Sequence, residues 1–130
     1  MAQRVSRFHR ILLWLASLDF AVFGLGFYLA PLSFNALLGV PTPDPIAVRA
    51  LGGFLLGGAV AALLAAINAS WSEARIVTLS LITWNLLNTA GMAFDLLVND
   101  GPAGLWPNVA ITAFFGITLA IAYGRGPRDS

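Results

Sequence analysis

The feature that most constrains this chain is a set of four long apolar segments. One of them, Arg49 to Ala66, has no charged residue after its arginine and is rich in glycine and alanine. Glycine weakens a helix in water, but in lipid small residues let neighbouring helices approach closely. Each segment has roughly 20 residues, the length that crosses about 30 Å of hydrocarbon. We therefore expect an integral membrane protein.

The composition supports this class and excludes several kinds of site. Hydrophobic residues make up 58% of the 130 residues and charged residues only 10%, which is far from the average of soluble domains. The chain has no cysteine, so it has no disulfides, thiolate metal sites or CxxC redox chemistry. A single histidine, His9, argues against a histidine-based metal site or haem ligation. The net charge of +1 gives no reason to expect nucleic acid as a partner.

The apolar segments predict an all-α fold, a single four-helix bundle over residues 1–130. We place the membrane helices at residues 11–29, 46–67, 75–98 and 106–123, separated by proline-rich and glycine-rich connections. The first apolar run continues to Leu29 without a small-x-small cleavage site, so we expect a membrane helix there and not a signal peptide. The turn near residues 68–72 is short, which makes the second and third helices antiparallel neighbours.

The arginines predict the orientation of the bundle. Arg49 alone lies on one side of the predicted membrane. The opposite side carries Arg4, Arg7, Arg10, Arg75, Arg125 and Arg128. Since basic residues favour the cytoplasmic side, both termini are expected to be cytoplasmic.

The long outer loop, residues 30–45, contains the apolar stretch PLSFNALLGV. A stretch of this kind lies in the membrane interface or folds back against the bundle. It is therefore the expected cap over any cavity that opens outward.

Polar side chains occur at the depth of the membrane midplane. Asp19 is nine residues into the first helix after Arg10, or roughly 13 Å deep, and Asn85 is at a similar depth on the third helix, with Asn88 one turn further. On the third helix the spacing places these asparagines on one inward-facing stripe, which comprises Thr78, Leu81, Asn85, Asn88, Met92 and Asp95. Asp19, Asn85 and Asn88 form either a midplane binding or proton-handling site, or a set of interhelical hydrogen bonds made by a protonated Asp19.

A second candidate site lies near the outer ends of the helices. Arg49 and Asp95 are expected to form an ion pair, with Asp44 as the competing partner of the arginine. Such a pair either fixes packing or recognises an anionic headgroup or carboxylate.

Aromatic side chains offer two interpretations. They could line a flat pocket for a quinone, carotenoid or sterol-like ligand, or they could fill space and face lipid. The residues concerned are Phe20, Phe23, Phe27, Phe54, Trp84, Phe94, Phe114 and Phe115. His9, which lies beside arginines, is expected to be solvated or to touch lipid headgroups.

Two helices carry small residues at intervals of four, the pattern of close helix packing. Either these two helices pack against each other, or one stripe faces outward and recruits another protein. The predicted packing residues are Gly53, Gly57, Gly58, Ala61, Gly116, Ala120 and Gly124.

Three local features resemble the DoxX-like group of small bacterial four-helix membrane proteins. They are the Ala-Pro step at Ala30 and Pro31, the Leu-Gly-Val-Pro segment from Leu38 to Pro41, and the arginine followed by Leu-Gly from Arg49 to Gly52. The resemblance implies a four-helix inner-membrane protein, in some cases an accessory subunit of quinone-linked or redox systems. It supplies no catalytic motif to transfer.

The sequence thus supports three functional hypotheses. The first is a non-catalytic accessory or scaffold subunit of a bacterial inner-membrane complex, with lipids and other membrane subunits or a second copy as partners. The second is a binder or carrier of a hydrophobic small molecule, such as a quinone, isoprenoid, pigment or lipid held non-covalently. The third is a quinone-linked membrane enzyme, for which Asp19 or Asp95 would be the general acid. No metal and no covalent cofactor are expected.

Overall fold

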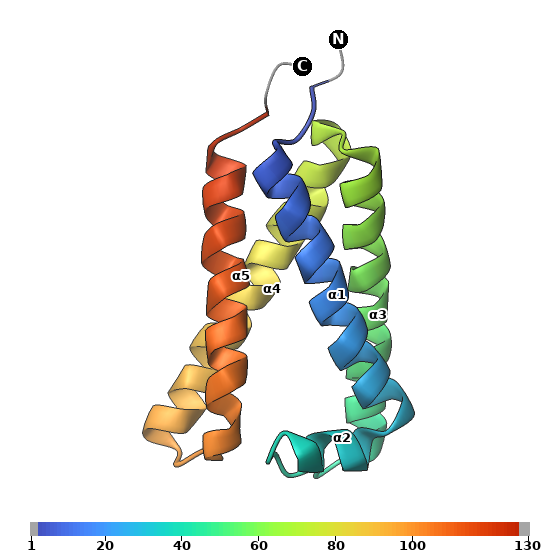
Figure 1. The fold of residues 1–130 in the computed structure, drawn as a ribbon. Coiled ribbons are helices and arrows are strands. Elements are labelled where there is room, and N and C mark those ends of the chain that lie inside the picture. Colours follow the sequence, from blue (N-terminus) through green and yellow to red (C-terminus); the bar gives the residue numbers. More distant parts are fainter. Residues whose placement is uncertain (1–2, 128–130) are drawn as a thin grey trace.

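The computed structural model describes residues 3–127, which form an all-α fold with four long helices (Figure 1). These are α1 (Arg7–Leu29), α3 (Pro45–Asn68), α4 (Trp71–Val98) and α5 (Trp106–Gly124). A short helix, α2 (Pro31–Leu37), follows α1, and the single 3-10 turn η1 (Ala103–Leu105) precedes α5. The four long helices are long and apolar enough to cross a membrane.

Two helices are longer than the sequence predicted. α1 and α4 begin about one turn earlier than expected, at Arg7 and Trp71. At α1 the reason is a cap, because the Ser6 side chain accepts a hydrogen bond of 3.1 Å from the backbone N–H of His9. Hydropathy gives no signal for these polar first turns. The proposed outer loop also contains α2, which starts at Pro31 in the favoured first-turn position.

The long helices associate in two antiparallel pairs. α1 packs mainly against α3, and α4 packs mainly against α5. In the first pair the backbones touch at Gly24 and Gly52, where a Cβ atom on Gly52 would lie 2.5 Å from the Tyr28 nitrogen and 2.8 Å from the Gly24 oxygen. Only glycine permits this approach.

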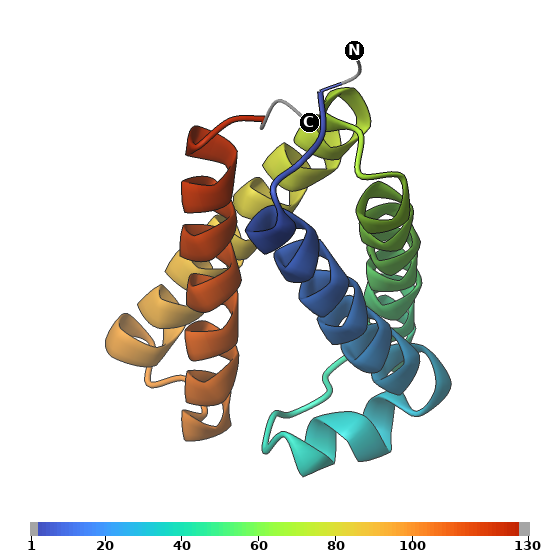
Figure 2. The ribbon, with the colours of Figure 1, turned by 45° about the horizontal axis from the view of Figure 1, so that its top comes forward.

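The two pairs meet at one end of the molecule and diverge toward the other (Figures 1 and 2). We call the first the closed end; it comprises the start of α1, the α3–α4 turn and the end of α5. We call the second the open end; it comprises α2, η1 and the helix ends beside them. Arg4, Arg10 and Arg125 lie at the closed end and Arg49 at the open end, whereas Arg128 lies outside the described residues.

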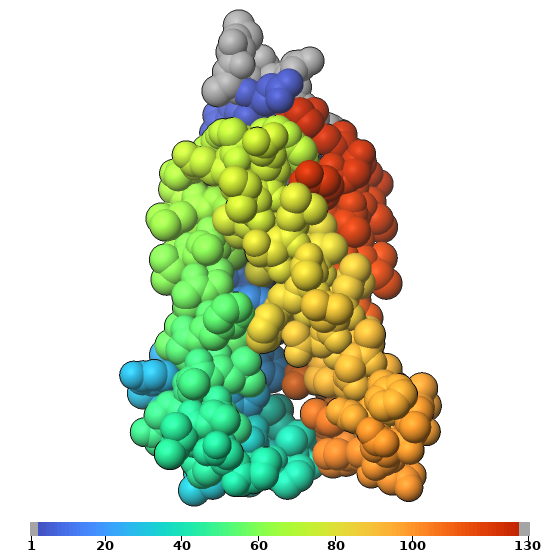
Figure 3. Space-filling model, turned by 180° about the vertical axis from the view of Figure 1, so that it is seen from behind, coloured from blue at the N-terminus to red at the C-terminus, as the bar shows by residue number. Residues whose placement is uncertain are grey.

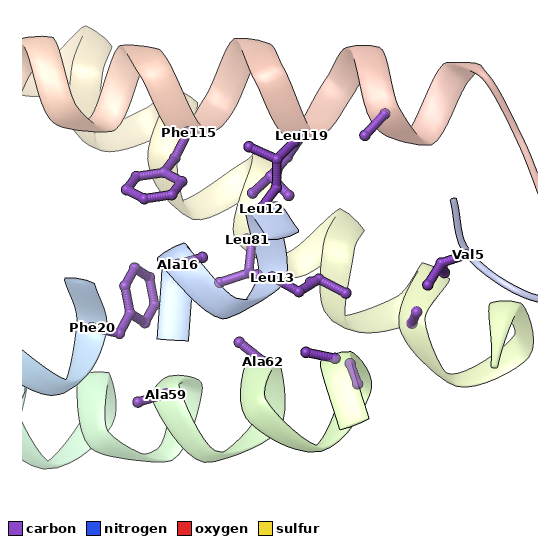
Figure 4. Close-up of a cluster of buried hydrophobic side chains, with 14 of the residues drawn as sticks. Val5, Leu12, Leu13, Ala16, Phe20, Ala59, Ala62, Leu81, Phe115 and Leu119 are labelled. Carbon is purple, nitrogen blue, oxygen red and sulfur yellow. The ribbon is translucent and has the colours of Figure 1, made fainter. Parts of the chain in front are cut away.

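The hydrophobic core fills the closed end, where α1 lies between α3 and α5 (Figure 4). Leu13 of α1 and Leu119 of α5 are completely buried there. Ala62 and Ala66 of α3 are also fully buried, so small side chains bring this helix close to α1. Large apolar side chains elsewhere point outward; Leu18, for example, is 62% exposed. An apolar exterior of this extent suits lipid contact.

Polar contacts tie the closed end together. The Arg10 Nε donates to the Ala66 carbonyl at 2.8 Å, and the Ser17 hydroxyl donates to the Ala59 carbonyl at 2.8 Å, both between α1 and α3. Ala66 lies in the last turn of α3, where carbonyls lack helical partners and a positive charge is favourable.

His9 corrects an expectation. It is not solvated but fully buried, and its Nε2 lies 2.7 Å from the Thr78 hydroxyl oxygen of α4. The Thr78 hydroxyl donates to the Ala74 carbonyl, which can only accept, so the His9 Nε2 carries the hydrogen of the shared bond. The His9 ring also packs edge-on against Trp71. The neighbouring arginines misled the interpretation, because α1 turns His9 inward while Arg7 and Arg10 stay exposed.

Candidate functional site

A cavity of about 290 Å³ lies between the two helix pairs, in the half of the molecule next to the open end. We call it the central cavity. The structure places Asp19 of α1 and both Asn85 and Asn88 of α4 in its wall. Helices α1, α2, α3, α4 and α5 and the η1 turn all contribute lining residues. The three midplane residues singled out in the sequence therefore share one cavity.

Three further polar residues line the central cavity that sequence reasoning did not assign to a site. They are Asn35, Asn108 and Thr112. Asn35 could have been assigned to the site from the sequence, since it is the one strongly polar residue within the apolar stretch expected to form a cap. Asn108 and Thr112 lie in the first half of α5, where a face could not be assigned without knowing the helix partner.

Asn85 is the most informative of these residues. Its side chain is completely buried, and its Nδ2 donates to the Leu81 carbonyl one turn earlier at 2.8 Å. Its Oδ1 is buried without a hydrogen-bond partner. Buried polar atoms are nearly always paired, so this oxygen, in a residue of the cavity wall, is a polar atom that still lacks a donor.

Asn88 repeats this geometry one turn along α4. Its Nδ2 donates to the Trp84 carbonyl at 2.8 Å. The side chain is half-buried and lines the central cavity. Two asparagines of α4 therefore use one N–H of their side chain within the helix, and the oxygen makes no hydrogen bond within the described residues.

Asp19 lies near the middle of α1 and is half-buried. Within residues 3–127 its carboxyl group has neither a hydrogen-bonded nor an ion-paired partner. It lines the central cavity and also an open groove between α1 and α5, whose walls include Leu18 and Phe114. The interhelical hydrogen bond expected as the alternative role of Asp19 is therefore not formed.

Aromatic rings form much of the apolar wall. The lining rings are Phe20, Phe23, Phe27 and Trp84. Trp84 contacts Phe20 edge-on at 6.2 Å and Phe54 of α3 at 5.0 Å between ring centroids. Of the other aromatic candidates, Phe94 and Phe114 are exposed and Phe115 belongs to the core.

The central cavity communicates with the exterior between α3 and α4. Figure 3 shows a narrow opening between these helices, through which part of α1 is visible. The Phe54 and Trp84 rings contact each other across the α3–α4 boundary, with centroids 5.0 Å apart, so side chains of the two helices still meet at this level. The opening gives the central cavity a lateral route to the exterior of the bundle.

The segment after α1 lies at the open end, as Figure 2 shows for α2. Asn35, Val40 and Pro41 contribute to the lining. The Asn35 Nδ2 lies 2.8 Å from the Thr42 hydroxyl oxygen, which fixes the loop after α2. This segment therefore covers the cavity at the position expected of a cap.

The expected Arg49–Asp95 ion pair is not formed. Both residues are exposed and neither lines the central cavity. Asp95 accepts a hydrogen bond from the Asn99 side chain at 2.9 Å, and Asp44 accepts from the backbone N–H of Ile46 as the cap of α3. The physical reason is the divergence of the pairs, which separates the open ends of α3 and α4.

Of the expected packing residues of α3, Gly58 does pack closely against α1, whereas Gly53 and Gly57 do not. Gly53 and Gly57 are exposed, and nothing lies within 4 Å of a Cβ placed on Gly57. Gly58 lies beneath the Phe20 ring, and Ala61 is half-buried in a shallow groove toward α4. The residue that makes the close backbone contact is Gly52, because the partner of α3 is α1 and not α5.

On α5 one of the three expected packing residues makes a close contact. Gly116 is buried, and a Cβ there would lie 2.7 Å from the Leu86 side chain. Ala120 is exposed, and nothing lies within 4 Å of a Cβ on Gly124. The partner helix is α4, which the Thr89 hydroxyl joins to α5 by donating to the Thr112 hydroxyl oxygen at 2.8 Å.

Comparison of the chain with protein-family models, curated proteins and solved structures finds no match. Within residues 3–127 no group of three or more histidine, aspartate or glutamate side chains is arranged to hold a metal ion. The central cavity is thus described by its own residues: apolar rings, amide oxygens and one carboxyl group.

Proposed function

We propose that this protein binds an amphiphilic small molecule in the central cavity. The observation that carries the proposal is the Asn85 Oδ1, a buried oxygen without a hydrogen-bond partner in a residue of the cavity wall. A donor on a bound molecule would satisfy it. The aromatic walls and the few convergent polar groups are typical of small-molecule sites.

Size and access narrow the class of molecule. A volume of about 290 Å³ lies at the lower end of the range of ligand pockets, about 300–1,000 Å³. The cavity therefore suits a headgroup or a single ring with a short chain better than an entire carotenoid. The opening between α3 and α4 would let an apolar tail remain in the lipid (Figure 3).

The proposal also includes the membrane in which the protein lies and its orientation there. Four helices are long and apolar enough to cross a membrane, and arginines gather at the closed end. By the positive-inside rule the closed end faces the cytoplasm of a bacterial inner membrane and the open end faces outward. The central cavity then lies in the outer half of the bilayer.

Native mass spectrometry tests the binding proposal. The probes are dodecylammonium, dodecanol and dodecanoate, added to the protein in a zwitterionic detergent. At least one probe is expected to remain as one molecule per chain. Met92→Trp, which places an indole in the cavity, should reduce the bound fraction at least about tenfold, as should Val48→Trp from α3.

Leu97→Trp is the matched control for Met92→Trp. Leu97 lies on the same helix, is 72% exposed and does not line the cavity, so its variant should bind as the parent does. Absence of every probe from the parent protein, or equal binding by all variants, contradicts the proposal.

A second observation supports the accessory-subunit hypothesis as an alternative function. Gly53 and Gly57 form an open, outward-facing strip on α3 that a helix of another chain could approach closely. Gly57→Ile would block that approach without disturbing the bundle, since nothing lies near this position. If a membrane protein co-purifies with the parent chain and is lost from the Gly57→Ile variant, the subunit role is supported. If the parent and the variant both purify without any other protein, the subunit role is contradicted.

A further inference from the structure

The polar atoms deep in the central cavity are mainly hydrogen-bond acceptors. The Nδ2 atoms of Asn85 and Asn88 bond to backbone carbonyls, which only accept hydrogen bonds. This fixes the orientation of both amides, because the atom facing a carbonyl must be the nitrogen. Each amide therefore keeps its oxygen, an acceptor, and one further N–H for other contacts.

Donors are scarce in the same region. The Thr112 hydroxyl is already used, since it lies 2.9 Å from the Asn108 carbonyl. None of the basic residues in 3–127 lines the cavity. Asn108, near the start of α5, is the one lining amide without a side-chain hydrogen bond within the described residues, and it lies toward the open end.

The cavity also carries charge of one sign only. Asp19 is its single acidic residue, and no cationic group of the described chain faces it. A carboxyl group at this depth of a membrane requires a partner. The rings of Phe20, Phe23 and Trp84 share the cavity with Asp19, and aromatic faces attract organic cations.

We infer that the molecule bound in the central cavity is an amphiphilic amine, with a protonated ammonium head and an apolar tail. The inference rests on the proposed function and names its ligand class. An ammonium group has three donors and no acceptor, so it complements the Asp19 carboxylate and the Asn85 and Asn88 oxygens. Its charge offsets that of Asp19, and its tail leaves between α3 and α4.

The same geometry disfavours other heads. A carboxylate or a quinone carbonyl presents only acceptors, and it would face the oxygens of Asp19, Asn85 and Asn88, which are acceptors as well. An alcohol has one donor and no charge, so it satisfies one acceptor and leaves Asp19 unpaired. The predicted order of affinity is ammonium, then alcohol, then carboxylate.

The test compares three probes with the same tail: dodecylammonium, dodecanol and dodecanoate. Dissociation constants are measured at pH 7 by titration in native mass spectrometry, in a zwitterionic detergent. Dodecylammonium should bind the parent protein at least about tenfold more tightly than dodecanol. Asp19→Asn should remove that preference while leaving dodecanol binding within about twofold, and Asp19→Glu should retain it.

Asp100→Asn is the matched control. It removes the same charge from an exposed loop position with φ of 51°, which asparagine tolerates well. Its preference for dodecylammonium should equal that of the parent protein.

The outcomes separate the inference from the proposed function. If no probe binds, the proposed function itself is wrong. If dodecanol or dodecanoate binds as well as dodecylammonium, or Asp19→Asn keeps the preference, the cavity binds amphiphiles but the ammonium inference is overturned. If Asp100→Asn alone loses the preference, the charge effect arises outside the cavity and the inference is equally overturned.

Discussion

The two ends of this molecule are built from the same four helices but in opposite ways. At the closed end, side chains such as Leu13 and Leu119 fill the space between the pairs completely. Toward the open end the pairs diverge and leave the central cavity, with Asn85 Oδ1 unpaired in its wall. The contrast suggests that the closed end supplies stability and the open half holds a molecule.

The largest expected effect compares truncations at the two ends. Leu13→Ala removes a fully buried side chain from a filled core and should lower the free energy of unfolding by about 2–5 kcal/mol. Met92→Ala enlarges a cavity that already exists, so it should cost less than about 1 kcal/mol. Denaturant titration in mixed micelles measures both. Equal losses would mean that the open half is packed as tightly as the closed end.

A smaller effect is expected where α1 and α3 touch. Gly52→Ala places a Cβ against the backbone of α1 and should cost about 1–3 kcal/mol. Gly57→Ala, on the open face of the same helix, should be neutral or slightly stabilising. Denaturant titration in mixed micelles measures both variants. An unchanged stability of Gly52→Ala would contradict the close contact between α1 and α3.

The His9–Thr78 bond across the closed end should contribute about 1 kcal/mol. A double-mutant cycle with His9→Ala and Thr78→Val isolates this term from the packing lost in each single variant. A coupling energy near zero would show that the bond does not help to hold α1 against α4.

The smallest effect has the opposite sign. Asn85→Leu removes an unpaired buried oxygen, so it should leave stability unchanged or raise it by up to about 1 kcal/mol. The same variant should bind dodecylammonium more weakly. A clear loss of stability would indicate that the Asn85 oxygen already has a structural partner.

Much of the architecture could be predicted from the sequence. Hydropathy and the proline-rich connections identified four helices, because apolar segments of this length have few alternatives. The three-and-four spacing on α4 placed Asn85 and Asn88 on one face with Leu81, and depth counting placed Asp19 beside them.

Helix partners could not be predicted in this way. Gly52 and Gly53 are adjacent in a run of apolar residues that extends from Ala50 to Ile67, so nothing in the pattern distinguishes the stripe that meets α1 from the one that faces outward. The Arg49–Asp95 pair failed for a related reason. Shared depth brings two residues together only if their helices stay close, and α3 and α4 diverge from a shared turn.

Protection of one introduced thiol tests the central claim most directly. The chain has no cysteine, so Met92→Cys in the cavity and Asp100→Cys in the exposed loop each give a unique site for N-ethylmaleimide. We predict that saturating dodecylammonium slows labelling of Met92→Cys at least about fivefold and leaves Asp100→Cys unchanged, as expected if the amine occupies the central cavity. Equal labelling rates of Met92→Cys with and without the amine would contradict binding in the central cavity.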